Sequence, residues 1–153
     1  MIGNIPKIRG FAKIRGGNGY SDLRGNATFV QTDRGVMVTV RVCGLPQDEK
    51  CNGGIFAMHI HEGENCAGDE IDQFSGAKTH YNPEDCQHPY HAGDLPPLIG
   101  NNGFAYLSVL TDRFTVSEII DKVIIIHENK DDFTTQSSGN SGTKIGCGKI
   151  TIA

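Results

Sequence analysis

Hydrophobic and polar residues alternate most clearly between Val36 and Val42. Valines occupy every second position of this segment, with Met37, Thr39 and Arg41 between them. Because successive side chains of a strand point to opposite faces, this period of two predicts a half-buried β-strand. Six further runs of strand character, separated by Gly, Asn, Asp or Pro, lie at residues 7–14, 26–31, 55–61, 104–110, 123–127 and 149–152. Together these runs predict an all-β sandwich or barrel.

A short helix and two long loops interrupt this rhythm. Segment 112–120 contains a capping residue followed by helical spacing, which predicts one short helix. The stretches from Glu62 to Gly100 and from Glu128 to Lys144 are polar and contain glycine, which predicts long loops. Such long loops are usually functional, or are held by something other than a hydrophobic core. Because the sequence has no internal repeat and no linker, we expect residues 1–153 to form a single domain.

The charge and the apolar content exclude several classes of protein. A net charge of −4 provides no overall positive field for nucleic acid or an anionic membrane. No run approaches the roughly 20 apolar residues of a membrane-spanning helix. The first six residues also lack the basic start and apolar run of a secretory signal. We therefore expect a soluble protein that binds neither nucleic acid nor membrane, with the cytoplasm favoured over the periplasm or the extracellular space.

Six histidines are the candidate chemical groups. His59 and His61 end an apolar strand, and alternation sends both imidazoles from the same face, roughly 6 to 7 Å apart. They can converge on one metal ion, although an isolated pair of this kind is also common at an exposed strand end. His127 ends the apolar run that begins at Val123, where a buried strand would reach the end of the barrel.

Three more histidines and one aspartate lie close together in the first long loop. His80, His88, His91 and Asp94 provide the number and kind of ligands that a closed tetrahedral zinc site needs. The loop has too few apolar residues to pack by itself, so a metal would supply its order. The alternative is that these are scattered surface histidines.

The histidine motifs carry a resemblance to a known family. In their order along the chain, they resemble the copper/zinc superoxide dismutases at His59-Ile60-His61-Glu62, His80-Tyr81-Asn82-Pro83, His91-Ala92-Gly93-Asp94-Leu95, residues 127–132 and 139–142, and Cys147-Gly148. The resemblance extends from about Arg24 to Ala153. It implies an eight-stranded Greek-key β-barrel, an immunoglobulin-like sandwich, with long metal-binding and electrostatic loops. The implied activity is the dismutation of superoxide to oxygen and hydrogen peroxide by Cu(II)/Cu(I) cycling.

The resemblance also implies a role for each site residue. The implied copper ligands are His59, His61, His80 and His127, and the implied zinc ligands are His80, His88, His91 and Asp94. His80 would bridge the two metals and later donate a proton. Asp131 would link His59 to His88, and such partners fix ring orientation and tautomer. Cys66 and Cys147 would form a disulfide, and the family default is a homodimer.

Three departures from the family pattern lie beside these residues. Lys144 occupies the usual arginine position at the copper channel, where lysine keeps the charge but loses the planar fork. Ala57-Met58 and Lys78-Thr79 replace the residues usual before the first copper histidine and before the bridging one. These departures leave a second hypothesis open, a copper-handling protein without turnover. A third, a β-sandwich recognition module, fits the strands but leaves the histidines unexplained.

Three cysteines remain outside the implied disulfide. Cys43 and Cys51 flank the turn Gly44-Leu45-Pro46, where they either form a second, smaller disulfide or remain thiols. Cys86, two residues from His88, is expected to be a buried thiol, with an alternative metal ligand or a redox partner as the other interpretations. An odd number of cysteines leaves at least one unpaired in a monomer.

Overall fold

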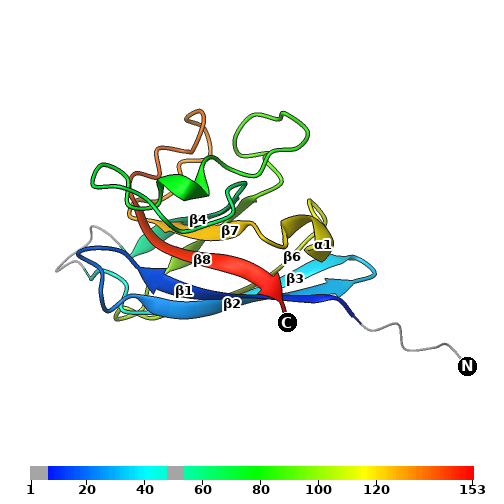
Figure 1. The fold of residues 1–153 in the computed structure, drawn as a ribbon, viewed down its shortest axis with the longest axis horizontal. Coiled ribbons are helices and arrows are strands. Elements are labelled where there is room, and N and C mark those ends of the chain that lie inside the picture. Colours follow the sequence, from blue (N-terminus) through cyan, green and yellow to red (C-terminus); the bar gives the residue numbers. More distant parts are fainter. Residues whose placement is uncertain (1–6, 48–53) are drawn as a thin grey trace, which may run out of the picture.

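The computed structural model describes residues 7–47 and 54–153 and consists mainly of antiparallel β-strands (Figure 1). The strands are β1 (Arg9–Gly16), β2 (Arg24–Thr32), β3 (Gly35–Cys43), β4 (Ile55–His61), β5 (Asp94–Ile99), β6 (Ala105–Thr111), β7 (Val123–His127) and β8 (Lys144–Ile152). Two short helices accompany them, the 3-10 helix Ser75–Ala77 and α1 (Val116–Ile119).

The strands form one curved sheet in the order β5-β4-β7-β8-β1-β2-β3-β6. Consecutive strands β1, β2 and β3 are neighbours, whereas the pairs β4–β7, β8–β1 and β3–β6 join strands that are distant in sequence. The edge strands β5 and β6 also contact each other, which nearly closes the barrel. This arrangement confirms the predicted all-β Greek-key barrel.

Alternation places the hydrophobic core inside the barrel. The four valines of β3 are buried, with exposed fractions of 0 to 1%, while Met37 and Arg41 face outward. Ile14, Phe29, Ile124 and other apolar side chains complete the core. A second, smaller apolar cluster lies on the other side of β7, where Phe74 and Ala77 of the first long loop cover Val123, Ile125 and Cys147. Strand β7 is therefore buried on both faces.

Two strands differ from the sequence-based expectation. Strand β5 lies inside the predicted loop 62–100. The sequence did not predict this strand because Pro96 and Pro97 are unusual in strands, although Leu95 and Leu98 are buried. Proline is tolerated there because β5 is an edge strand. Strand β8 begins at Lys144, five residues before the predicted start at Lys149.

The predicted short helix is confirmed as α1. A capping box lies at its N-terminus. The Thr115 hydroxyl accepts a hydrogen bond from the Glu118 amide, and the Glu118 carboxylate accepts one from the Thr115 amide. Val116 and Ile119 of this helix are buried against the barrel. Within the described ranges, no helix has the length and apolar character needed to cross a membrane.

Candidate metal centre

The histidines of β4 and β7 point out of the barrel toward the long loops. Ile60 packs in the barrel core, so alternation directs His59 and His61 to the opposite face. Ile126 likewise packs inside and His127 lies outside. All three histidines are nevertheless buried, with exposed fractions of 0 to 3%, because segments 62–93 and 128–143 cover this face. The loops above β4 and β7 are visible in green and orange in Figure 1.

The first group of candidate ligands consists of four buried imidazoles. The group is His59, His61, His80 and His127, whose ring nitrogens lie within 4.8 Å of one another. The Nε2 atoms of His61 and His127 are only 3.3 Å apart. His61 Nδ1 lies 2.8 Å from the Lys78 carbonyl oxygen and His127 Nδ1 lies 3.2 Å from the Gly142 carbonyl oxygen, so both Nδ1 atoms are donors.

Two neutral imidazoles that each donate through Nδ1 present lone pairs at Nε2. No proton then lies between the facing Nε2 atoms of His61 and His127, so their 3.3 Å approach is not a hydrogen bond but a contact between two acceptors. Such a contact is repulsive unless a cation lies between the acceptors. The pair is therefore suited to a metal ion, because neutral imidazole nitrogen is the form that binds one.

The second group of candidate ligands surrounds Asp94, at the start of β5. Its Oδ1 lies 2.8 Å from His80 Nδ1, and its Oδ2 lies 3.1 Å from His88 Nδ1 and 3.3 Å from His91 Nδ1. The His80 and His91 Nδ1 atoms are 3.1 Å apart. His59 also falls within 4.8 Å of the other members of this group. His91 contacts the same Asp94 carboxylate as His80 and His88, so it is a further candidate ligand of this group.

Asp131 connects the two groups through hydrogen bonds to one histidine of each. Its Oδ2 accepts a hydrogen bond from His59 Nε2 at 2.7 Å, and its Oδ1 accepts one from His88 Nε2 at 2.8 Å. Burial alone would raise the pKa of Asp131, but the hydrogen bonds from His59 and His88 lower this pKa to about 2. The carboxylate is therefore charged near neutral pH. It directs the Nδ1 atoms of His59 and His88 toward the interior of the site.

Three buried ring nitrogens make no hydrogen bond within the described residues: His59 Nδ1, His80 Nε2 and His88 Nδ1, whose 3.1 Å contact with Asp94 does not form a hydrogen bond. A buried polar atom without a partner is costly, and each such atom in a folded protein needs an explanation. A metal ion held by each group of ligands would supply it. Four imidazoles are a donor set suited to copper, and three imidazoles with one carboxylate are suited to a tetrahedral zinc ion. The residues present therefore fit both metals.

Burial also favours the ligand form of the histidines. It lowers the pKa of His61 well below the usual value and lowers the pKa of His127 to about 3. Burial disfavours the charged imidazolium because the interior solvates charge poorly. The rings are thus neutral near pH 7 without a metal.

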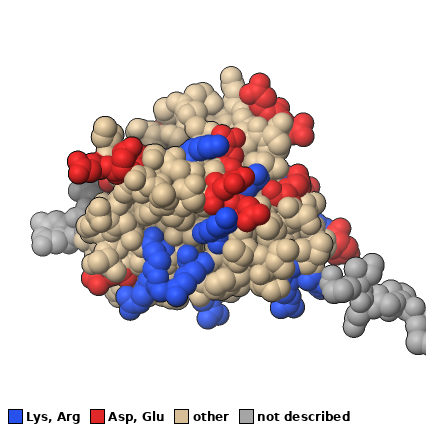
Figure 2. All heavy atoms as spheres, in the orientation of Figure 1, with Lys and Arg blue, Asp and Glu red and all other residues tan. Residues whose placement is uncertain are grey.

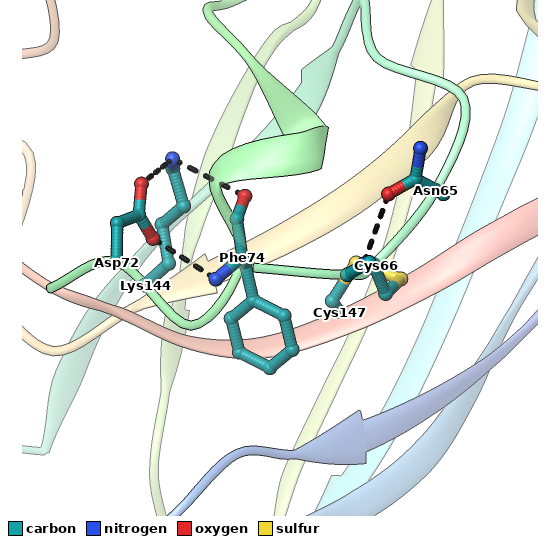
Figure 3. Close-up of a disulfide and its surroundings, with 7 residues drawn as sticks. Asn65, Cys66, Asp72, Phe74, Lys144 and Cys147 are labelled. Atoms are coloured by element: carbon teal, nitrogen blue, oxygen red, sulfur yellow. Dashed lines mark hydrogen bonds and ion pairs between the residues drawn. A yellow bond between two sulfur atoms is a disulfide. The ribbon is translucent and has the colours of Figure 1, made fainter. Parts of the chain in front are cut away.

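Lys144, the predicted channel cation, lies in an ion pair. Its Nζ is 2.6 Å from Asp72 Oδ2 and 3.4 Å from the Phe74 carbonyl oxygen (Figure 3). Nothing in the sequence separates Asp72 from the other acidic residues of its loop, so sequence reasoning missed it. Only the fold brings positions 72 and 144 together.

The cysteines give three outcomes. Cys66 and Cys147 form a disulfide, which attaches the first long loop to β8. The suggested Cys43–Cys51 pair lies partly outside the described residues, because Cys51 falls within 48–53, so it stays a prediction. The expectation of a buried Cys86 thiol is wrong. Cys86 is exposed, since Asn82 hydrogen bonds to its backbone in a surface turn.

Comparisons with known proteins agree with this geometry. A family model described as copper/zinc superoxide dismutase matches residues 23–150. A superoxide dismutase [Cu-Zn] of Legionella pneumophila is 32% identical and aligns with 82% of this chain and 76% of its own length. One of Schizosaccharomyces pombe is 32% identical over 95% of this chain and 99% of its own length. A Drosophila melanogaster relative named extracellular superoxide dismutase [Cu-Zn] is also 32% identical, over 86% and 77% of the two chains.

Proposed function

This chain belongs to the copper/zinc superoxide dismutase family, and from that premise we propose which residues carry its activity. The protein converts superoxide to oxygen and hydrogen peroxide, with copper and zinc as its metals. The proposed copper ligands are His59, His61, His80 and His127. The proposed zinc ligands are His80, His88, His91 and Asp94. We also propose that residues 1–153 form a single domain.

The observation that carries this assignment is the set of buried ring nitrogens without partners. His80 is the central residue, because its Nδ1 lies beside Asp94 while its Nε2 has no partner. One ring that directs Nδ1 toward the Asp94 group and an unpartnered Nε2 toward the other imidazoles supports a bridging role. Copper, when bound, supplies one-electron chemistry through its Cu(II) and Cu(I) states, whereas zinc has no redox chemistry and orders the loop.

The chain's own residues orient the site and handle a proton. Asp131 holds the rings of His59 and His88 in one tautomer, since both donate to its carboxylate. The Lys78 and Gly142 carbonyl oxygens do the same for His61 and His127. We propose that His80 Nε2 takes up a proton and delivers it to the departing peroxide. Lys144, in the family's usual arginine position, is the residue proposed to face the incoming superoxide anion.

Metal stoichiometry of single variants tests the assignment. We expect His61→Gln to bind zinc but little copper, His91→Gln to bind copper but little zinc, and His80→Gln to lose affinity for both. The measurement is elemental analysis after loading and desalting. Equal loss of both metals in all three variants would contradict separate sites.

Stopped-flow superoxide decay by the wild-type protein, before and after copper loading, separates the enzyme from a copper-handling protein without turnover.

Two further parts of the proposal concern the protein's environment. We propose that two copies associate as a homodimer, as the resemblance implies, and that the protein acts in the cytoplasm. Sedimentation velocity over a range of concentrations tests the first, and fractionation of the source cells tests the second.

A further inference from the structure

The ion pair between Lys144 and Asp72 is the feature of this site that the assigned ligand roles do not explain. Its Nζ to Oδ2 distance of 2.6 Å makes it the shorter of two lysine–carboxylate pairs within the described residues. The Lys144 side chain is 16% exposed and that of Asp72 is 40% exposed, so the pair lies at the surface end of the site. A cation already paired at this distance offers an approaching anion much less field than a free one.

Contacts other than the ion pair with Lys144 also hold the Asp72 carboxylate in place. Its Oδ1 accepts a hydrogen bond from the Phe74 amide at 3.0 Å, and the Asp69 carboxylate accepts one from the Asp72 amide at 2.9 Å. The same segment is fixed to β8 by the Cys66–Cys147 disulfide, as Figure 3 shows. Asp72 is therefore a fixed partner for Lys144 rather than an occasional surface contact.

The pair lies beside the proposed copper ligands. Lys144 is the direct strand partner of His127, across the β7–β8 ladder. The loop segments over the site carry few cations: segment 62–79 contains five acidic residues and only Lys78 as a base. Segment 128–144 contains three acidic residues and two lysines, one of them Lys144. Red acidic side chains are prominent in the upper part of Figure 2, where these loops lie. Any steering of superoxide by these two segments therefore depends largely on how much of the Lys144 charge is free.

We propose that Asp72 is a positioning residue that holds the Lys144 ammonium at the rim of the copper site and cancels its charge, so that superoxide meets a neutral pair. This inference rests on the proposed function. It predicts that the native pair provides little electrostatic attraction, and that removal of the carboxylate frees a cation that attracts the anion.

Three variants test the proposal against a charge-matched control. Asp72→Asn removes the negative charge but keeps an Oδ1 acceptor for the Phe74 amide. Lys144→Gln and the double variant complete a cycle. The control, Asp121→Asn, makes the same change in net charge and breaks the 3.3 Å pair with Lys149. Lys149 lies five residues along β8 from Lys144, roughly 16 Å at the rise of a strand.

The first readout is the rate constant for superoxide decay by the copper- and zinc-loaded proteins at low and high ionic strength. At low ionic strength, we expect Asp72→Asn to be about threefold faster than wild type, Lys144→Gln about threefold slower, and the double variant equal to wild type within about 1.5-fold. These differences should disappear near 1 M salt, where the Debye length is about 3 Å. Asp121→Asn should stay within about 1.5-fold throughout.

Two further readouts do not depend on turnover. Azide, a small anion titrated against the visible spectrum of the copper protein, should bind about threefold more tightly to Asp72→Asn. The Lys144 ammonium should give a slowly exchanging NMR signal in the zinc-only wild-type protein and lose it in Asp72→Asn. A double variant several-fold slower than wild type, or an Asp72→Asn no different from Asp121→Asn, would overturn the inference alone. Lack of dismutation by loaded wild type would overturn the proposed function and this inference together.

Discussion

Asp131 is the residue on which the two halves of the metal centre depend most directly. One carboxylate fixes His59 for the copper group and His88 for the zinc group through hydrogen bonds of 2.7 and 2.8 Å. Because both rings lose their orientation together, removal of this charge is expected to weaken both sites. Residues that orient metal ligands typically contribute a factor of about 10 to 100 in metal affinity.

Asp131→Asn should therefore reduce the affinity for zinc and for copper by about 10- to 100-fold. An amide retains one acceptor oxygen but presents an NH₂ group to the second imidazole, which also donates. Competition with a chromophoric chelator measures both affinities. Asp132→Asn is the matched control, since that carboxylate hydrogen bonds only to Thr134 and Thr135 in its own turn. Equal losses in the two variants would show that loop structure alone is responsible.

The ligands of the metal centre differ from Asp72 and Cys86 in how far the sequence predicts them. The spacing of His80, His88, His91 and Asp94 predicted one ligand group, because these residues lie in one short loop segment. The grouping of His80 with His59, His61 and His127 came from the family resemblance. The role of Asp72 could not be predicted from the sequence, because its pairing with Lys144 depends on how the fold brings together two residues 72 positions apart. The exposure of Cys86 was also missed, because the direction of a surface turn is set by local hydrogen bonds from Asn82.

At the scale of elements, the disulfide is the main connection between the first long loop and the barrel. It joins residues 81 positions apart, which corresponds to roughly 4 kcal/mol by loop-closure entropy. The Cys66→Ala and Cys147→Ala double variant should lose about that free energy of unfolding in urea. Cys86→Ala, which removes an exposed thiol, should change the free energy of unfolding by less than about 0.5 kcal/mol. A double variant as stable as wild type would mean that the apolar cluster around Phe74 holds the loop unaided.

Helix α1 provides a prediction about pH. Hydrogen bonds from the Thr115 side chain and backbone lower the pKa of Glu118. A lowered folded-state pKa means that the charged carboxylate stabilises the protein above its unfolded pKa of 4.5, and that this stabilisation is lost as pH falls through the folded value. Thr115→Ala should cost about 1 kcal/mol at pH 7 and less at pH 3. Urea unfolding at both pH values measures the difference, with Ser117→Ala as the control in the same helix. If the loss of unfolding free energy in Thr115→Ala did not change with pH, the charge of the Glu118 carboxylate would not contribute to the cap.

The sequence predicted strands with a simple alternation of apolar and polar residues. It missed parts of strands where the backbone accommodates glycine or proline and the alternation is interrupted. In β8, Gly146 and Gly148 leave the strand without the side chains that mark its start. An added Cβ at Gly146 would lie 2.9 Å from Leu23 Cδ2, and one at Gly148 would lie 2.8 Å from the Lys13 carbonyl oxygen. The backbone contact makes a side chain costly at position 148, where a strand pattern would expect valine or isoleucine, whereas at position 146 Leu23 would have to move. Strand β5 shows the same effect with proline at an edge.

At the scale of the whole molecule, the barrel and the metal centre are stabilised by different means. The barrel has a continuous apolar core in which the four valines of β3 pack with Ile14 and Phe29. The loops over His59 and His61 are held by the small cluster around Phe74, one disulfide, hydrogen bonds such as that between Gln136 and His88, and the imidazoles themselves. Removal of metal should therefore affect the loops first, because it leaves buried ring nitrogens unsatisfied at their centre.

Hydrogen exchange with and without a chelator tests this division. After metal removal, amides in residues 78–93 and 128–143 should exchange at least tenfold faster, while those of β1, β2 and β3 should change little, because their hydrogen bonds belong to the barrel ladder. Zinc alone should restore protection to residues 78–93, since the proposed zinc ligands come from that segment and from the start of β5. A uniform increase across barrel and loops would mean that the metals stabilise the fold as a whole. Protection that returns only with copper would contradict the assignment of His88, His91 and Asp94 to zinc.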